Sequence, residues 1–564
     1  MSWRTVGTSA SILVGLAVAG SLVGPAWDPE PLRDPIVPSV ESTEIGGTEA
    51  AALAGQLFEP GTFEIRESTH TIALDEYEVN AILREPVGIG FDAVAIVFVH
   101  GAGTGRAYEA FVEQATQLAS AGIVTLVPDK RLDTYTTWHR DYEQMARDYL
   151  HSFEFLRALP GVDPERVGVY GESEGAWIVP IMQVFQPSIA FTIQASAPVL
   201  PPRAQAAFAV DNFLRNVDVP NQIFRAIPRA LGIPFPLGIL EYADFDVTPW
   251  LRQQSAPILM LYGAADPSMP IDQGARKVIA ETAIGGRGAP VTVRYYYGAD
   301  HGLRVDGIVV PDVSRDIAAW AQGLPETAYA EPRIAGAQPE QMFLATSVPS
   351  PVWWVNGNVV LGSVIAGIIL LLLGPFAWLV RWLVVRRRGS GTKVTPAETV
   401  IPANGGADDL PEGFAYGYDD DAYDDAPGGE ADWDEPDAGT VKHGRFARRI
   451  PGILFGIGAG SFLTLAALIV YLMAVAVLSV NYAQHPALVQ FGWLGVRLLG
   501  LITVIFMAMM VERVREVRES RRTGDRKSLV VSGWEAHLTL WSTLIGSGLL
   551  MLWLTYWGVF QLGI

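Results

Sequence analysis

Hydrophobic positions follow two different patterns in the two halves of the chain. From residue 62 to 325, short apolar runs each end in Gly, Pro, Asp or a small residue: AIVFVHG, IVTLVPD, RVGVYGE, FTIQASA, PILMLYG and VTVRYYYG. Stretches with helical periodicity lie between several of them, for example at 138–158 and 174–186. Continuous apolar strands that alternate with helices are typical of a mostly parallel sheet covered on both faces. We therefore predict a doubly wound α/β domain over residues 62–325.

The C-terminal half contains much longer apolar runs. They cover residues 359–383, 453–480, 490–510 and 538–562. Each run reaches the roughly 20 residues that a helix needs to cross the hydrocarbon layer of a bilayer. The sequence therefore predicts four transmembrane helices that follow the α/β domain.

Basic clusters between these runs predict the orientation. RRR at 386–388 follows the first run, RFARR at 445–449 precedes the second, and the basic loop 511–537 joins the third and fourth. Basic loops stay in the cytoplasm. This arrangement predicts a multi-pass cell-membrane protein whose α/β domain lies outside the cytoplasm.

The N-terminus has the pattern of an export signal. Arg4 supplies a positive flank, residues 10–23 are apolar, and Gly24-Pro25-Ala26 offers small residues to a signal peptidase. We expect residues 1–26 to be a signal peptide or, alternatively, an uncleaved signal anchor. Either form exports the segment that follows, in which residues 27–61 are rich in Pro, Glu, Gly and Ala and are expected to be a linker.

Charge and composition refine this picture. The formal net charge is −20, and residues 408–437 contain thirteen Asp and Glu without any Lys or Arg. The segment 384–452 is therefore expected to be a disordered acidic cytoplasmic loop, either a spacer or a binding site for a partner that the sequence does not identify. Nucleic-acid binding is not expected, because phosphates require a basic surface. The segment 326–358 is expected to be a second linker.

An insertion interrupts the strand–helix rhythm at residues 198–255. Its helical pieces are broken by prolines. Such a segment between two late strands suits a cap over a substrate pocket. A longer crossover that never touches substrate is the alternative.

The candidate nucleophile is Ser173 in the sequence GESEG. The strand RVGVY precedes this sequence, and the helical stretch EGAWIVPIMQVF begins within it. A tight strand–turn–helix with glycines two residues before and after the serine is a nucleophile elbow, which holds the hydroxyl above the sheet at a helix N-terminus. The motif alone is weak, but its position at a predicted strand–helix junction strengthens it.

A serine nucleophile needs a base and an acid that orients the base. His301, in GADHG, is the only histidine between the elbow and the first predicted membrane helix, and it follows the last predicted strand. Asp266 follows the strand before that, so the order Ser, Asp, His matches an α/β-hydrolase triad. Asp300 and Asp272 are the alternative acids.

Backbone amides are the candidate oxyanion donors. The loop FVHGAGTG at 98–105 could direct the N–H of Ala102 at the oxyanion, and the N–H of Glu174 would be the second donor. His100 is expected to be structural. The chain has no cysteine, which excludes disulfides, cysteine nucleophiles and thiolate metal sites. No metal and no cofactor is expected.

Residues 94–302 resemble the α/β-hydrolase superfamily, in particular serine hydrolases related to dienelactone hydrolases, prolyl oligopeptidases and serine aminopeptidases. VHGAG, PDKR, LPGVDPERVGVYGESEGAW, LYGAADPSMP and GADHG carry the resemblance. It implies cleavage of an ester, thioester or amide in a small molecule or peptide through an acyl-enzyme. An acyltransferase, or a catalytically silent binding module, is the alternative. The membrane region resembles no family that we recognise.

Three features remain beside this interpretation. Glutamates flank the nucleophile, and we expect Glu172 and Glu174 to disfavour anionic substrates unless Glu172 pairs with a basic residue. Glycines at 452, 456 and 460 predict a small-residue face for helix packing. Arg497 lies near the outer end of the third apolar run and is expected to reach toward water.

Overall fold

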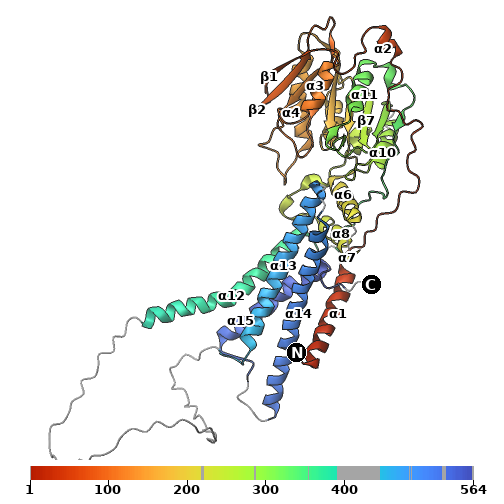
Figure 1. Ribbon diagram of the computed structural model, residues 1–564. Helices are drawn as coiled ribbons and strands as arrows, with labels where there is room; N and C mark the ends of the chain where they lie inside the picture. The colour runs from red at the N-terminus through yellow and green to blue at the C-terminus, as the bar shows by residue number, and fades with distance from the viewer. Residues whose placement is uncertain are drawn as a thin grey trace, which may run out of the picture.

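The computed structural model describes residues 2–217, 221–284, 288–352, 355–389, 445–481, 483, 485–523 and 529–561. An α/β domain lies at one end of the molecule and a bundle of long helices at the other, with the predicted insertion between them (Figure 1). The predicted acidic loop falls mainly on residues 390–444, which lie outside the described residues.

The α/β domain is built on a nine-stranded sheet with the order β1-β2-β4-β3-β5-β6-β7-β8-β11. β1 and β2 pair antiparallel, as do β2 and β4, and the other neighbours are parallel. The central strands are buried on both faces, which explains their continuous apolar runs. The strands are β1 (Ile65–Ala73), β2 (Glu78–Pro86), β3 (Ala93–Val99), β4 (Val124–Pro128), β5 (Val162–Glu172), β6 (Thr192–Ala195), β7 (Ile258–Gly263), β8 (Val291–Tyr296) and β11 (Ile334–Gly336).

Helices cover both faces of this sheet. One hydrophobic core joins one face to α4 (Tyr142–Arg157), α5 (Gly175–Phe185) and α10 (Ile271–Ile284). A second core joins the other face to α3 (Val112–Ser120) and α11 (Pro311–Gln322). The predicted fold class, a mostly parallel doubly wound sheet with an insertion and C-terminal apolar helices, is therefore confirmed.

The domain includes parts of both segments that were expected to be linkers. Ile36 and Ile45 are buried in the two cores, and the N–H of Gly336 donates to the carbonyl of Val40 at 2.9 Å. β11 pairs with β8 beyond the expected boundary at residue 325. Short apolar anchors hold these Pro- and Gly-rich segments in place, and no long periodic pattern marks them.

The insertion connects the domain to the helical bundle. It contains α6 (Pro202–Asn216), α7 (Asn221–Phe224), α8 (Ala226–Leu231), the 3-10 turns η1 (Pro236–Gly238) and η2 (Glu241–Asp244), and α9 (Thr248–Leu251). Phe213, Leu214 and Ile227 share one apolar cluster with residues of the long helices. The ring of Phe245 instead lies 4.8 Å from that of Tyr142 in the α/β domain. The insertion is thus more than a cap or a crossover, because its helices dock on the bundle.

Five helices are long and apolar enough to cross a membrane: α1 (Trp3–Val23), the part Gly357–Val384 of α12 (Gly357–Gly389), the part Ile450–Ser479 of α13 (Ile450–Asn481), α14 (Pro486–Arg522) and α15 (Trp534–Tyr556). A Cβ at Gly456 would lie 2.5 Å from Phe506, and one at Gly460 would lie 2.4 Å from Thr503 Oγ1. A Cβ at Gly452 would meet no atom of the described residues within 4 Å. The predicted small-residue face therefore includes two of its three glycines, and it packs against α14.

The N-terminal helix lies beside the bundle (Figure 1). Thr8 Oγ1 donates to Glu512 Oε1 of α14 at 2.8 Å, and a Cβ at Gly20 would lie 2.5 Å from the carbonyl oxygen of Thr555 in α15. These contacts suit a retained helix, although the choice between signal peptide and anchor stays a prediction. Arg497 is half-buried and donates to the carbonyls of Val559 and Gln561, so it holds the segment that follows α15.

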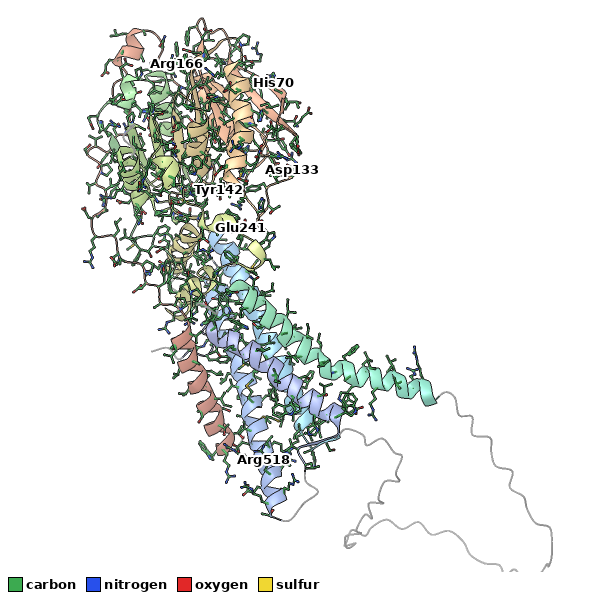
Figure 2. The ribbon with its side chains drawn as sticks, turned by 180° about the vertical axis from the view of Figure 1, so that it is seen from behind. His70, Asp133, Tyr142, Arg166, Glu241 and Arg518 are labelled. Atoms are coloured by element: carbon green, nitrogen blue, oxygen red, sulfur yellow. The ribbon has the colours of Figure 1, made fainter. Side chains whose placement is uncertain are left out.

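The basic end of α14 is remote from the α/β domain. Figure 2 shows Arg518 at the far end of the bundle, whereas Tyr142 and Asp133 lie at the edge of the domain that is nearest to Glu241 of the insertion. The edge of the domain that carries the candidate site therefore faces the insertion and the bundle.

Candidate active site

Ser173 has the backbone conformation of a nucleophile elbow. It lies between the end of β5 and the start of α5, and its φ is 52°. This left-handed conformation is strained for a residue with a side chain. The N–H of Ser173 donates to the carbonyl of Ala195 at the end of β6 at 2.9 Å. The turn is therefore held by the neighbouring strand.

The two flanking glycines are required by close backbone approach. A Cβ at Gly171 would lie 2.7 Å from the carbonyl oxygen of Gly175, and one at Gly175 would lie 2.4 Å from that of Val99. Real Cβ atoms do not approach backbone so closely. This is the physical reason for the spacing of glycines around Ser173 that the sequence shows.

His301 and Asp266 form the pair that the sequence predicts. His301 Nδ1 lies 2.8 Å from Asp266 Oδ2, and the Asp266 side chain is fully buried. The other carboxylate oxygen accepts the N–H and the Oγ–H of Ser268 at 2.8 and 2.7 Å. Burial alone would lower the pKa of His301, but the Asp266 carboxylate and, more weakly, Glu172 raise it above its usual value. Asp266 can thus orient the imidazole and stabilise its protonated form.

The alternative acids serve other partners. Asp300 Oδ1 accepts the backbone N–H groups of Gly302 and Arg304 at 2.9 and 3.0 Å. Asp272 is paired with Arg276 at 2.7 Å on α10. Asp266 is therefore the acid that the structure brings to His301.

The end of β6 links the serine turn to the histidine loop. Ala195 accepts the N–H of Ser173, and the next residue, Ser196, donates through Oγ to the carbonyl of His301 at 2.7 Å. Within the described residues, Ser173 Oγ makes no hydrogen bond to the His301 ring. Such bonds are often long in enzymes without substrate and tighten when substrate binds.

The two candidate oxyanion donors lie beside the serine. A Cβ at Gly101 would lie 3.4 Å from the Ser173 Cβ, so the loop that contains Ala102 packs against the elbow. Across the part of the chain that the structure describes, the N–H groups of Ala102 and Glu174 donate to no acceptor. Both amides are available to a developing negative charge near Ser173.

His100 has the structural role expected for it. Its ring is fully buried, and Nε2 lies 2.7 Å from the carbonyl oxygen of Pro128 while Nδ1 lies 3.2 Å from Thr104 Oγ1. Burial lowers the pKa of His100 to about 4. The ring is therefore neutral at physiological pH and links the loop to β4.

The sequence does not predict the surroundings of the Glu174 side chain, which is only 2% exposed. Lys130 Nζ lies 3.3 Å from Oε2, and Arg140 forms an ion pair with Oε1. The hydroxyls of Tyr135 and Tyr142 donate to the same carboxylate at 2.7 and 3.3 Å. We call these five residues the Glu174 cluster. Both oxygens of the Glu174 carboxylate are thus paired inside the protein, and the expected effect of the two glutamates on anionic substrates stays a prediction.

Glu172 differs from Glu174 in the partners of its carboxylate. Its carboxylate accepts the Tyr170 hydroxyl at 3.3 Å, and among the described residues no Lys or Arg forms a salt bridge with it. Burial raises the pKa of Glu172. The salt bridges to Lys130 and Arg140 are thus made by Glu174 and not by Glu172.

Comparison with known proteins finds likeness only among solved structures. No protein-family model matches the chain, and no curated protein sequence matches it. A putative dipeptidyl aminopeptidase IV from Bacteroides ovatus is 17% identical over 46% of this chain and 36% of its own, with a TM-score of 0.34. A putative dienelactone hydrolase from Klebsiella pneumoniae is 16% identical over 47% of this chain and 100% of its own, with a TM-score of 0.32. An esterase from Pyrococcus furiosus is 14% identical over 51% of this chain and 97% of its own, with a TM-score of 0.33. The chain thus spans about a third of the aminopeptidase.

Proposed function

We propose that the protein is a membrane-anchored serine hydrolase that acts outside the cytoplasm on an ester, thioester or amide. One observation carries this proposal: a buried carboxylate, Asp266, holds a histidine at the edge of the sheet where a strained serine turn projects. The arrangement of apolar helices and basic ends supports the membrane anchor and the orientation.

The reaction follows from the positions of these groups. Ser173 Oγ attacks the substrate carbonyl carbon, and His301 Nε2 takes the hydroxyl proton while Asp266 holds the Nδ1–H. The N–H groups of Ala102 and Glu174 stabilise the negative oxygen of the tetrahedral intermediate. Collapse breaks the bond to the leaving alcohol, thiol or amine, which receives the proton from His301. Water then attacks the acyl carbon while His301 takes one of its protons, and the bond to Ser173 Oγ breaks as His301 returns that proton to the serine oxygen and the acid is released.

The test is labelling of the full-length protein, purified in detergent, with a fluorophosphonate probe. We expect the wild type to be labelled and Ser173→Ala to be unlabelled, because the probe reacts only with an activated serine. Ser120→Ala, at the end of α3, is the matched control and should be labelled like the wild type. A folded wild type without labelling would contradict the proposal and favour the silent binding module.

Product analysis then separates hydrolysis from transfer. The acyl-enzyme is common to both reactions, and only its acceptor differs. Adding an alcohol acceptor should leave the free acid as the main product. A main product that carries the added alcohol would identify an acyltransferase.

A further inference from the structure

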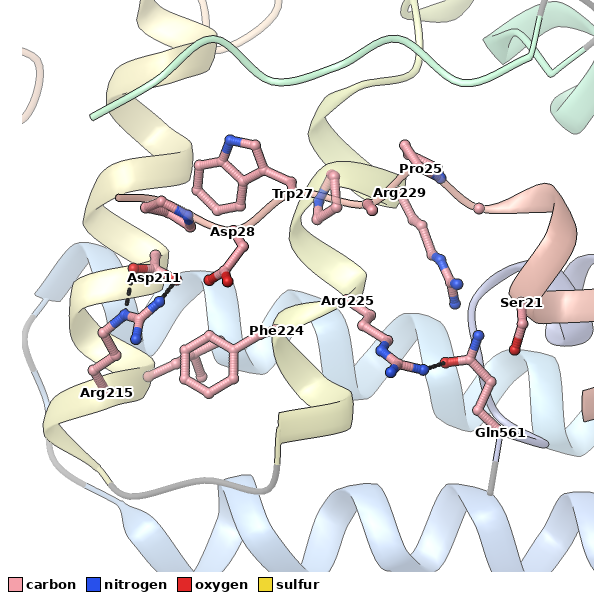
Figure 3. A pocket seen from close by; sticks show the side chains of 15 residues that line it. Ser21, Pro25, Trp27, Asp28, Asp211, Arg215, Phe224, Arg225, Arg229 and Gln561 are labelled. Carbon is pink, nitrogen blue, oxygen red and sulfur yellow. Dashed lines mark hydrogen bonds and ion pairs between the residues drawn. The ribbon is translucent and has the colours of Figure 1, made fainter. Parts of the chain in front are cut away.

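A pocket of about 730 Å³ lies where the insertion meets the long helices (Figure 3). Its walls come from the end of α1, the segment 24–29, the helices α6 and α8, and Gln561 after α15. We call it the junction pocket. It belongs to neither the serine turn nor the loops around it.

Arg229 is buried in this pocket and forms no salt bridge with any of the residues that the structure describes. The residue is 2% exposed, and its Nη2 donates to the carbonyl of Gly20 at 3.1 Å. Within the described ranges, Nε and Nη1 of Arg229 have no hydrogen-bond acceptor. A buried guanidinium with unsatisfied N–H groups is costly unless a ligand accepts from them.

The other charges of the pocket leave this cation unbalanced. Arg215 is neutralised by Asp211 at 2.7 Å, and Asp28 lies on that side of the pocket (Figure 3). Arg225 lies on the side of Arg229 and donates to Gln561 Oε1 at 3.0 Å. Among the described lining residues, three arginines and two aspartates leave one net positive charge.

Burial and the neighbouring cation both act on Arg229. Burial lowers the pKa of Arg229 to about 10, although Tyr556 raises it, and the charge of Arg225 adds a smaller lowering. The guanidinium remains protonated at neutral pH. Arg225 and Arg229 both line this pocket, and arginine matches the geometry of phosphate oxygens well.

The position of the pocket favours a lipid as the source of that anion. α1 ends at Val23 and α15 ends at Tyr556, so the pocket lies where two apolar helices leave the predicted hydrocarbon layer. Leu214 and Phe224 add apolar surface beside the arginines. A phospholipid can place its phosphate against the arginines and its acyl chains against the apolar surface, whereas free phosphate can use only the arginines.

We propose that the junction pocket binds the phosphate group of a membrane phospholipid, with Arg229 and Arg225 donating to its oxygens. Gln561 Nε2, which has no acceptor among the described residues, is a third donor. This site is independent of the triad, since none of its residues belongs to the serine, histidine or aspartate loops.

Native mass spectrometry of the full chain tests the proposal. The protein is delipidated in detergent and titrated with phosphatidylglycerol, with diacylglycerol and with inorganic phosphate. We expect phosphatidylglycerol to bind, and Arg229→Gln and Arg225→Gln each to weaken its affinity by about tenfold, because each removes a charge-assisted hydrogen bond. Arg66→Gln, an exposed arginine on β1, is the control and should bind like the wild type.

The other arms can overturn the proposal. Equal binding of diacylglycerol would exclude recognition of the phosphate, and equal binding of inorganic phosphate would identify a free anion as the ligand. Unchanged affinity in Arg225→Gln would also contradict the site. Arg225 is exposed, so we expect Arg225→Gln to fold even if Arg229→Gln does not.

Discussion

Two regions of the molecule contain a buried charged side chain, and they differ in the number of partners that the described residues supply to it. In the Glu174 cluster, one carboxylate receives two cations and two hydroxyl donors. In the junction pocket, the described residues give Arg229 one carbonyl partner and leave two nitrogens of its guanidinium without an acceptor. A charge whose partners are all supplied by the chain supports the structure around it. A charge without them indicates a ligand from outside the chain.

The largest effect is expected at the third buried charge, Asp266. Asp266→Asn should reduce turnover roughly 10,000-fold, because the amide favours the wrong tautomer of His301. Asp316→Asn is the control, since Asp316 is equally buried and pairs with Arg315 at 2.8 Å away from the triad. Steady-state hydrolysis of a chromogenic ester measures both. Similar losses in the two variants would mean that Asp266 is only structural.

The same pair predicts a pH dependence. The pKa of His301 is raised above 6.5, so turnover should increase with pH and reach half its maximum above pH 6.5, where the imidazole becomes neutral. The stability contributed by protonated His301 has the opposite sign. It is fully present below pH 6.5 and is lost as the pH rises through the raised pKa. A midpoint at or below pH 6.5 would contradict this assignment.

The next largest effect is expected on the free energy of unfolding, where the Glu174 cluster and the junction pocket can be compared directly. Glu174→Ala should lower the free energy of unfolding by about 3–5 kcal/mol, because Lys130 and Arg140 lose their buried counterion. Arg229→Met in delipidated protein should change it by less than about 1 kcal/mol, or increase it, because an uncompensated charge is removed. Denaturant unfolding in detergent measures both. Equal destabilisation would show that Arg229 is a structural charge like Glu174.

The smallest effect is expected for the two hydroxyls that donate to the Glu174 carboxylate. Tyr135→Phe should cost about 1 kcal/mol, because a hydroxyl at 2.7 Å from a charged acceptor is lost from a half-buried position. Tyr142→Phe should cost less, because its hydroxyl lies at 3.3 Å from Glu174 and the ring keeps its packing. Denaturant unfolding of the two variants gives the order. The reverse order would mean that these distances do not reflect hydrogen-bond strength in the cluster.

Patterns within short segments predicted much of this molecule. The central strands were predictable because burial on both faces leaves continuous apolar runs. The elbow was predictable because steric exclusion fixes its two glycines, and Asp266 and His301 follow from strand order at one edge of a sheet. The C-terminal apolar runs were predictable because length alone identifies them: the first three lie within α12, α13 and α14, and the fourth begins within α15, which ends at Tyr556, before the predicted end at residue 562.

Contacts between distant segments were not predictable in this way. Lys130 and Arg140 lie in the connection after β4, which carries no periodic pattern, and only the fold brings them to Glu174. The docking of α6 and α8 on the long helices joins residues more than two hundred positions apart. Arg229 has no local signal either, because its lack of a partner is a property of the assembled pocket.

The apolar face of α6 limits how the protein can be divided. Phe213 and Leu214 are buried against the long helices, while Gln205 and Asn212 donate to the carbonyls of Ser268 and Pro267, directly after Asp266. A truncated fragment that ends after the sheet would expose this face to solvent and would be prone to aggregate. The loop that follows Asp266 would also lose its hydrogen bonds to α6. The α/β domain and the long helices thus share α6 as a common packing element, and separating them would remove contacts from both.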